Sequence, residues 1–172
     1  MVIERSGYIL RPWVINDVAS LAENINSKKI WDNVRDSLPF PYTITDAQSY
    51  ITYTLETPYP QNFAIVVNDK AVGCVGISPC TDVERISAEI GYWLGEAYWG
   101  RGYTSDAVKA VAEYTFKQTK IMRLYATVYE NNKASMRVLE KAGFTRLCTL
   151  HKAAIKNGII LDTPYYELVK PD

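Results

Sequence analysis

The chain has 172 residues, of which 48% are hydrophobic and 22% are charged, and its 19 Lys and Arg residues balance 19 Asp and Glu residues. This length and apolar content predict one domain, residues 1–172, with a packed core, and they exclude wholesale disorder. The zero formal net charge and the lack of a long basic run argue against nucleic-acid binding by a charged surface.

The N-terminal residues do not have the pattern of a targeting segment, because Glu4, Arg5 and Arg11 interrupt the apolar residues. No apolar stretch is long enough to span a membrane, so we expect no membrane partner. The cysteines form a sparse, odd set that suits buried thiols in a reducing cytosol: Cys74, Cys80 and Cys148. We therefore expect a cytoplasmic protein.

The first part of the chain is predicted to be largely helical. A short strand over residues 8–13 is followed by a helix that begins at Asn16 or Asp17. The apolar residues of this helix fall on one face: Val18, Leu21, Ala22 and Ile25. A second helix begins near Thr45, after a segment punctuated by prolines.

The middle of the chain contains a hairpin and then a strand and a helix. Residues 63–67 and 71–77 are rich in strand-forming residues and flank a turn at residues 68–70. A strand over 86–94 leads to a helix over 105–119. The apolar stripe of that helix consists of four residues: Val108, Val111, Ala112 and Thr115.

The C-terminal part is predicted to form a strand over 122–130, a short helix and a long hairpin. Asn131 or Asn132 caps the helix, and Gly143 suits its left-handed stop. Its inward-facing residues are Val138, Leu139 and Ala142. Residues 144–156 and 159–169 flank an Asn-Gly pair, which is typical of a tight hairpin turn. This order of elements places a strand–helix–strand crossover among antiparallel strands, which predicts a mixed sheet with helices on its faces.

Two glycines flank an arginine in YWGRGYTSDAV, residues 98–108, just before the central helix. The N-terminus of a helix carries unpaired N–H groups and about half a positive charge, and glycines in front of it let an anion approach closely. Arg101 adds a fork of donors suited to phosphate oxygens. Residues 100–105 are therefore a candidate diphosphate cradle, although a tight turn without a ligand explains the glycines about equally well.

Other nucleotide-binding and metal-binding patterns fit poorly. The chain lacks the G-x-x-x-x-G-K-[ST] pattern of a phosphate-binding loop. A dinucleotide fingerprint requires a glycine or alanine where Ser105 stands, and a carboxylate near residues 121–123. His151 is the single histidine, and no Cys-x-x-Cys or His-x-x-x-His spacing is present, so we expect no metal site.

Two segments, AEIGYWLGEAYWGRGYTSDAV and LYATVYENNKASMRVLEKAGF, together resemble the GNAT superfamily of acyl-CoA-dependent N-acetyltransferases. The resemblance is nearest to the branch of ribosomal-protein N-terminal (alanine/serine) acetyltransferases. LRPW and LPFPYTITDAQSYI, closer to the N-terminus, also resemble this branch. The family's loop pattern Q/R-x-x-G-x-G/A is altered here, because Trp99 replaces Gln or Arg and Thr104 replaces Gly or Ala. The W-G-x-G that results is similar to the loop of that branch.

The resemblance implies an α+β fold with a central mixed, mostly antiparallel twisted sheet, splayed parallel strands at its centre, and helices on both faces. It also implies acetyl-CoA as cosubstrate. The pyrophosphate would be held by backbone amides of Gly100, Arg101, Gly102, Tyr103, Thr104 and Ser105. The pantetheine arm would pair with the backbone of Tyr92, Trp93 and Leu94. A further cofactor contact would come from Asn132, itself an equally good helix cap. Lys133, Arg137 and Lys141 are candidates for contact with the 3′-phosphate, although charged residues on a helix face are more commonly solvated.

Direct attack by a primary amine on the thioester is also implied. Deprotonation at pH 7 costs about 4.6 kcal/mol for a lysine-like amine, but only about 1 kcal/mol for an α-amine. Glu89 is the first candidate base, with Asp162 and Glu167 in reserve. Ser135 matches the family's N-x-x-S element and is the preferred proton donor to the thiolate, with Tyr129 as the alternative.

The sequence says least about the acceptor of the acetyl group. Trp31 and Tyr42 are candidate substrate residues, together with Arg35, Phe40 and Tyr53, although an aromatic core explains any one of them. The expected acceptor is a protein N-terminus. The alternatives are a small amine (a polyamine, an amino acid or a drug) and, in another class, a CoA-binding sensor without turnover. A homodimer is compatible with the sequence.

Overall fold

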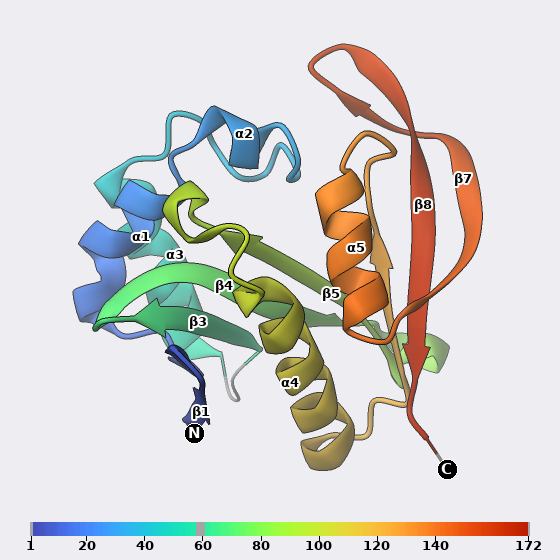
Figure 1. The fold of residues 1–172 in the computed structure, drawn as a ribbon, viewed down its shortest axis with the longest axis horizontal. Helices are drawn as coiled ribbons and strands as arrows, with labels where there is room; N and C mark the ends of the chain where they lie inside the picture. The colour runs from blue at the N-terminus through green and yellow to red at the C-terminus, as the bar shows by residue number, and fades with distance from the viewer. Residues whose placement is uncertain (1, 58–60, 172) are drawn as a thin grey trace. The chain divides into compact units, whose positions relative to one another are not determined.

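The computed structural model describes residues 2–57 and 61–171 (Figure 1). Its strands are β1 (Ile3–Arg5), β2 (Tyr8–Pro12), β3 (Asn62–Val67), β4 (Lys70–Pro79), β5 (Ser87–Leu94), β6 (Arg123–Thr127), β7 (Thr145–Lys156) and β8 (Ile159–Val169). Its helices are α1 (Val18–Ile25), α2 (Lys28–Trp31), α3 (Ile44–Glu56), α4 (Tyr103–Gln118) and α5 (Lys133–Lys141). Short 3₁₀ turns are η1 (Ile15–Asp17), η2 (Asp82–Glu84) and η3 (Glu96–Tyr98).

The strands that the structure describes form a mixed sheet in the order β1-β2-β3-β4-β5-β6-β8-β7. The sheet is mostly antiparallel, and β5 and β6 form its parallel pair over Ser87–Glu89 and Arg123–Tyr125. The helix α4 connects these two parallel strands, as a crossover connection must. The mixed sheet with a central crossover, predicted from the order of elements, is confirmed.

The chain divides into two compact units. Unit 1 comprises Met1–Gly76 and Tyr92–Ala107, and unit 2 comprises Ile77–Gly91 and Val108–Asp172. Because the boundaries fall inside β4, β5 and α4, these elements contribute residues to both units.

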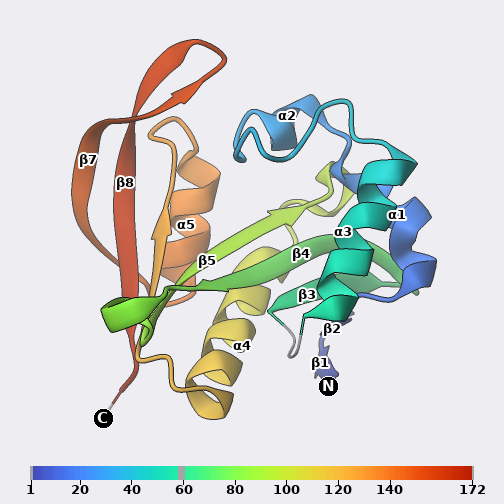
Figure 2. The ribbon, with the colours of Figure 1, turned by 180° about the vertical axis from the view of Figure 1, so that it is seen from behind.

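Unit 1 contains the N-terminal hairpins and the helices α1 and α3, which pack side by side (Figure 2). The α3 helix is capped by Thr43, which forms a reciprocal capping box with Asp46. Its core is built on aromatic and aliphatic side chains from both helices and strands, among them Trp13, Leu21, Ala22, Ile25, Ile51, Ala64 and Val66. The predicted inward face of α1 is thus confirmed at Leu21, Ala22 and Ile25.

A buried ion pair lies beside this core. The Arg11 guanidinium donates to both carboxylate oxygens of Asp17, at 2.7 and 2.8 Å, and this contact raises the pKa of Arg11. Asp17 is only 3% exposed and also accepts a hydrogen bond from the Val14 amide. The Asp17 side chain, predicted as a possible cap of α1, makes no cap hydrogen bond to that helix, because it is occupied by these two partners.

We expect Asp17→Ala to lower the free energy of unfolding by about 3–5 kcal/mol, since it leaves the Arg11 charge without its partner. Urea denaturation followed by circular dichroism measures this loss. Asp32→Ala is the matched control, because the Lys28–Asp32 pair is an exposed i,i+4 contact expected to contribute about 0.5 kcal/mol or less. Equal losses in the two variants would contradict a stabilising role for the buried pair.

Unit 2 contains β6, β8 and β7, the helix α5, and the α4 residues from Val108 onward. Figure 1 shows α5 lying beside these strands. The predicted stripe of α4 is buried: Val108, Val111, Ala112 and Thr115 are at most 3% exposed. Gly143 ends the α5 segment with φ +95°, and the β7–β8 turn has positive φ at Asn157 and Gly158, both as predicted. The strand β6 is shorter than predicted and ends at Thr127, because the chain turns where the amide of Asn132 donates to the carbonyl of Tyr129.

The cysteines differ from the expectation of buried thiols. Cys74 is buried and Cys80 partly buried, but Cys148 is exposed. Cys148 lies on β7, the edge strand of the sheet, most of whose residues are exposed. Burial raises the pKa of the Cys74 thiol to about 11, which keeps it unreactive at neutral pH.

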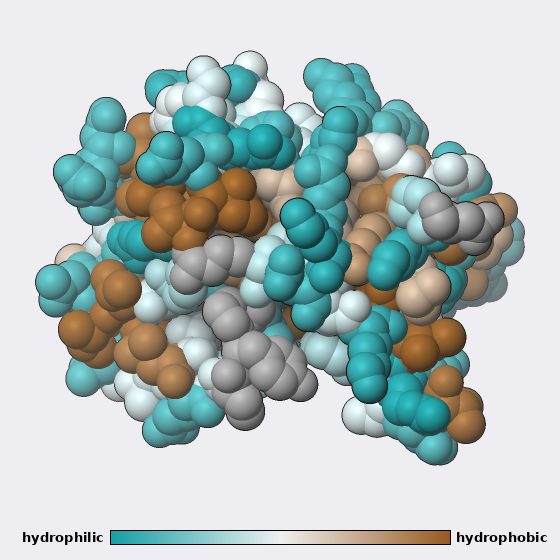
Figure 3. All heavy atoms as spheres, turned by 90° about the horizontal axis from the view of Figure 1, so that it is seen from below, coloured by the Kyte–Doolittle hydropathy of each residue, from teal (hydrophilic) through white to brown (hydrophobic). Residues whose placement is uncertain are grey.

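On the face drawn in Figure 3, apolar side chains form small patches separated by polar ones. No described helix combines the length and the apolar character needed to cross a bilayer.

Candidate functional site

The loop between η3 and α4, in unit 1, has the backbone of an open anion site. Gly100 and Gly102 have φ values of +77° and +80°, a conformation that side-chain-bearing residues rarely adopt. A Cβ built on either glycine meets no atom within 4 Å. The glycines are therefore required by the backbone conformation, and the space in front of them is open to a ligand.

The helix α4 begins immediately after this loop. Its first backbone hydrogen bond runs from the Asp106 amide to the Gly102 carbonyl, at 3.2 Å, and the Ser105 hydroxyl donates to the same carbonyl at 3.0 Å. The amides of the first turn, including Tyr103 and Thr104, have no carbonyl one turn earlier in the helix to bind. The Arg101 side chain is exposed and donates to the Ala97 carbonyl at 3.1 Å. A helix start of this kind suits a phosphate group.

The end of β5 is tied to the loop. The indole nitrogen of Trp99 donates to the carbonyl of Leu94 at 2.6 Å, and the Gly95 amide donates to Val72 on β4 at 2.8 Å. Leu94 is buried, Trp93 packs against the core of unit 1, and Tyr92 is partly exposed. The predicted pantetheine strand and the predicted pyrophosphate loop are thus directly connected within unit 1.

A polar contact links the same loop to α2. Glu96 of η3 accepts hydrogen bonds from the Ser27 hydroxyl and, at 2.7 Å, from the Lys29 ammonium. These two partners, Lys29 first, hold the pKa of Glu96 below its ordinary value. Ser27 is also the N-cap of α2, the helix that ends at Trp31. The contacts of Glu96 with Ser27 and Lys29 therefore anchor α2, which includes Trp31, to the start of the loop.

The two candidate substrate residues differ in their surroundings. Trp31 is partly exposed, donates from its indole nitrogen to the Leu38 carbonyl at 2.9 Å, and packs against Phe40 with ring centroids 5.7 Å apart. Tyr42 is only 7% exposed and belongs to the core, and its burial raises the pKa of its hydroxyl to about 12. Of the two, Trp31 has the more exposed side chain.

In unit 2, Glu89 lies opposite Tyr125 at the last pair of the parallel ladder. Beyond this pair the described residues show no further β5–β6 pairing, although the strands continue to Gly91 and Thr127 within the unit. The pKa of Tyr125 is raised to about 12, first by its hydrogen bond with Cys80 and by burial, and also by the charges of Cys80 and Glu89. Glu89 is thus paired with Tyr125 at the point where the two parallel strands stop pairing.

The two reserve carboxylates are engaged by other groups of unit 2. Glu167 accepts from Arg123 at 2.7 Å, and Arg123 also contacts the rings of Tyr125 and Tyr165, which stack with centroids 5.5 Å apart. Asp162 accepts from the Lys152 amide at 2.8 Å and lies 2.7 Å from the His151 ring nitrogen. These contacts, the Lys152 amide first, lower the pKa of Asp162.

The start of α5 holds the remaining predicted residues. Asn132 is the N-cap, and its side-chain oxygen accepts from the Ser135 amide at 3.0 Å, so the predicted cap is confirmed. Ser135 and Tyr129 are partly exposed and Lys133 is exposed. The N-x-x-S spacing therefore has a structural role as a cap, and the Ser135 side chain retains contact with solvent.

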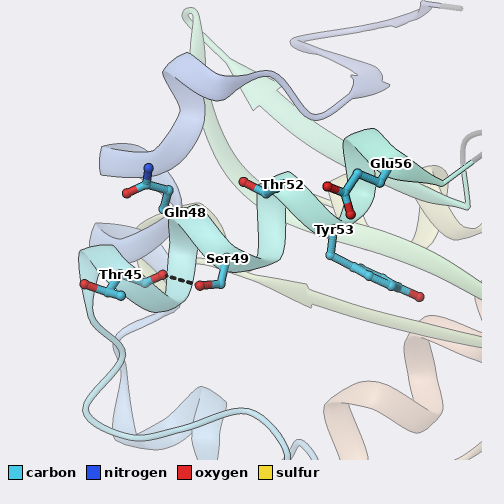
Figure 4. Close-up of a pocket in the computed structure, with 6 residues that line it drawn as sticks. All are labelled: Thr45, Gln48, Ser49, Thr52, Tyr53 and Glu56. Atoms are coloured by element: carbon cyan, nitrogen blue, oxygen red, sulfur yellow. Dashed lines mark hydrogen bonds between the residues drawn. The ribbon is translucent and has the colours of Figure 1, made fainter.

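A separate surface hollow of about 470 Å³ lies along α3 (Figure 4). It is lined by Thr45, Gln48, Ser49, Thr52, Tyr53 and Glu56. All six belong to one helix, and the Ser49 hydroxyl is already bonded to the Thr45 carbonyl at 2.9 Å. Of the residues considered for the acceptor, the hollow includes Tyr53 alone.

Comparison with known proteins decides the family. The family model described as "Acetyltransferase (GNAT) domain" matches residues 8–145. The chain belongs to the GNAT family of acetyltransferases. It is 33% identical over 136 residues to the probable N-acetyltransferase YjcK of Bacillus subtilis (strain 168), covering 76% of this chain and 75% of that protein. As a GNAT protein it is an N-acetyltransferase by class.

Two further GNAT relatives are informative. The ribosomal-protein-serine acetyltransferase of Escherichia coli (strain K12) is 25% identical over 157 residues, covering 88% of this chain and 86% of that protein. The microcin C7 self-immunity acetyltransferase MccE, solved in complex with acetyl-CoA and AMP, has a TM-score of 0.82 and 25% identity, covering 96% of this chain and 94% of that one. The GNAT fold expected from the two sequence segments is confirmed.

Sequence reasoning missed the residues that hold the first turn of α4 in this GNAT chain. Asp106 accepts a hydrogen bond from the Tyr8 hydroxyl at 2.7 Å and forms an ion pair with Arg5. Tyr8 and Asp106 are 98 positions apart, so no local pattern pointed to their contact.

Proposed function

We propose that the protein transfers the acetyl group of acetyl-CoA to the α-amine of a protein N-terminus. The observation that carries the proposal is the open loop at Gly100 and Gly102, which leads directly into the start of α4. A pyrophosphate needs amide donors without side chains in front of them, and this loop meets that requirement. The crystal complex of the relative MccE with acetyl-CoA supports the choice of cosubstrate.

Each residue has a proposed role. The amides of residues 100–105 bind the pyrophosphate, and the backbone of residues 92–94 binds the pantetheine arm in the manner of an added strand. Asn132 and Lys133 contact the cosubstrate from the start of α5. Trp31 and Tyr42 are the proposed acceptor residues, and of these Trp31 is the more exposed.

The chemistry requires proton transfers at the amine nitrogen and at the sulfur. When bound, acetyl-CoA supplies a thioester, and its carbonyl carbon is the atom to which the amine nitrogen of the acceptor bonds. Glu89, acting directly or through a water molecule, accepts the proton that the ammonium form of the acceptor loses before its nitrogen attacks. The nitrogen loses a second proton to water as the C–N bond forms. Ser135 donates a proton to the sulfur as the C–S bond breaks, and Ser135 then regains a proton from water while Glu89 releases the one that it took. The products are an amide and coenzyme A with its thiol protonated. A thiol pKa near 8.5 means that this donor need not be strong.

Ser135→Ala is expected to lower kcat by about a hundredfold, near the lower limit for general acid catalysis. The Kd for CoA should stay within about twofold of wild type, because the Asn132 cap binds the backbone amide of residue 135, which the substitution retains. Steady-state kinetics and calorimetry measure the two quantities. An unchanged kcat would remove Ser135 from the mechanism and leave Tyr129 as the candidate donor.

The test of the function is CoA release from acetyl-CoA with a panel of amines. The panel contains Ala- and Ser-starting peptides, spermidine, free amino acids and an aminoglycoside. Release with the peptides alone supports the proposal, and the E. coli relative named for ribosomal-protein serine makes a Ser-starting peptide the first choice. Release with a small amine alone would assign a small-molecule acceptor. No release, together with thermal stabilisation by CoA, would indicate a sensor.

A further inference from the structure

The first turn of α4 is held by the N-terminal hairpin of unit 1. Tyr8 is buried, with 4% of its surface exposed. Its hydroxyl donates to one carboxylate oxygen of Asp106 at 2.7 Å. The Nε atom of Arg5 lies 3.2 Å from that same oxygen. A single carboxylate oxygen of α4 is thus held by one residue of β1 and one of β2.

The turn between β1 and β2 adds a second attachment. Gly7 has φ +87°, and a Cβ placed there would lie 2.8 Å from the Tyr103 hydroxyl. The rings of Tyr8 and Tyr103 are also in contact, with centroids 5.1 Å apart. Tyr103 is the first residue of α4, so two residues of its first turn, Tyr103 and Asp106, are located by the hairpin.

The charges in this cluster matter for an anionic ligand. A carboxylate in the first turn of a helix interacts favourably with the same partial positive charge that a phosphate would use. Asp106 would therefore oppose a pyrophosphate bound at the neighbouring amides. Arg5 compensates the negative charge, and the Tyr8 hydroxyl fixes the direction of the carboxylate.

We propose that Arg5, Tyr8 and Asp106 form a positioning cluster for the pyrophosphate of coenzyme A. This inference rests on the proposed function, because it assigns the cluster to the same loop. The cluster keeps the first-turn amides of α4 aligned, and it removes the net charge that would repel the ligand. Arg5 and Tyr8 act through Asp106 and need not touch the ligand.

The test compares the Kd for CoA, by calorimetry, among four variants of the full chain. Tyr8→Phe and Arg5→Gln are each expected to raise this Kd about three- to tenfold, the effect of losing one hydrogen bond or one ion pair. Adding Asp106→Asn to Arg5→Gln should return the Kd toward the wild-type value, because it removes the uncompensated charge. Thermal melting reports the stability of each variant.

Tyr166→Phe is the matched control. Tyr166 is buried, as Tyr8 is, and its hydroxyl donates to a carboxylate oxygen of Glu140 at 3.0 Å, but it belongs to unit 2. It should lower the melting temperature like Tyr8→Phe while leaving the Kd for CoA unchanged. An equal increase of Kd in Tyr166→Phe, or no increase in either Tyr8→Phe or Arg5→Gln, overturns the inference. Absence of CoA binding in the wild type would instead overturn the proposed function.

Discussion

Gly102→Ala should raise the Kd for CoA by about ten- to a hundredfold. The new methyl group enters the open space in front of the loop, where the pyrophosphate is expected, and the loop must also leave its φ of +80° or carry strain. Losing one hydrogen bond to a charged group costs about 1.5–3 kcal/mol, which sets this range of affinity. Calorimetric titration with CoA measures the change.

Gly158→Ala supplies the control for backbone strain. Gly158 has φ +75° and likewise no atom within 4 Å of a built Cβ, but it lies in the turn between β7 and β8. Each substitution should destabilise the fold by about 1–2 kcal/mol, the cost of a left-handed residue that bears a Cβ. Only Gly102→Ala should weaken CoA binding. If both variants bind CoA as tightly as the wild type, the loop does not hold the pyrophosphate.

Glu89→Gln is expected to lower kcat by about a hundred- to ten-thousandfold at pH 7, the range for loss of a general base. The Kd for CoA should not change, because the proposed contacts of the cosubstrate do not involve this side chain. The defect should become smaller as the pH is raised through the pKa of the amine, since the free amine then forms without help. It should also be larger for a lysine-like amine than for an α-amine.

A pH–rate profile with a Ser-starting peptide and with a lysine-like amine tests these expectations. Glu113→Gln is the control, because Glu113 is an exposed carboxylate on α4 of the same unit. A variant with wild-type kcat at every pH would exclude Glu89 as the base. Attention would then turn to Glu167 and Asp162, which would each have to release a present partner, Arg123 or the Lys152 amide.

The parts of the fold that follow from local chemistry were predictable from the sequence. Gly143 and the Asn157-Gly158 pair adopt the positive φ values for which these residue types are favoured. The α4 stripe is buried because its apolar residues recur with the helical period. The glycines of the loop were identified for the same reason, since their requirement is local to the backbone.

The remaining features depend on contacts between distant residues. Asp17 was considered as a helix cap, but Arg11 from the preceding strand takes both its oxygens. Cys148 is exposed with most of β7, and whether other elements cover the faces of a strand cannot be read from one segment. The roles of Glu89 and Ser135 stay predictions, because they concern a reaction and not a conformation.

The contact between Tyr8 and Asp106 has a consequence for how the protein is made. The β1–β2 hairpin is translated before the partner that it holds, because Asp106 follows Tyr8 by 98 residues. Closing so long a loop carries an entropic cost that only other tertiary contacts can offset. The loop over residues 100–105 therefore cannot reach the geometry described here before residue 106 has been synthesised, so a nascent chain that stops earlier contains β1 and β2 without the contact that aligns the proposed pyrophosphate site.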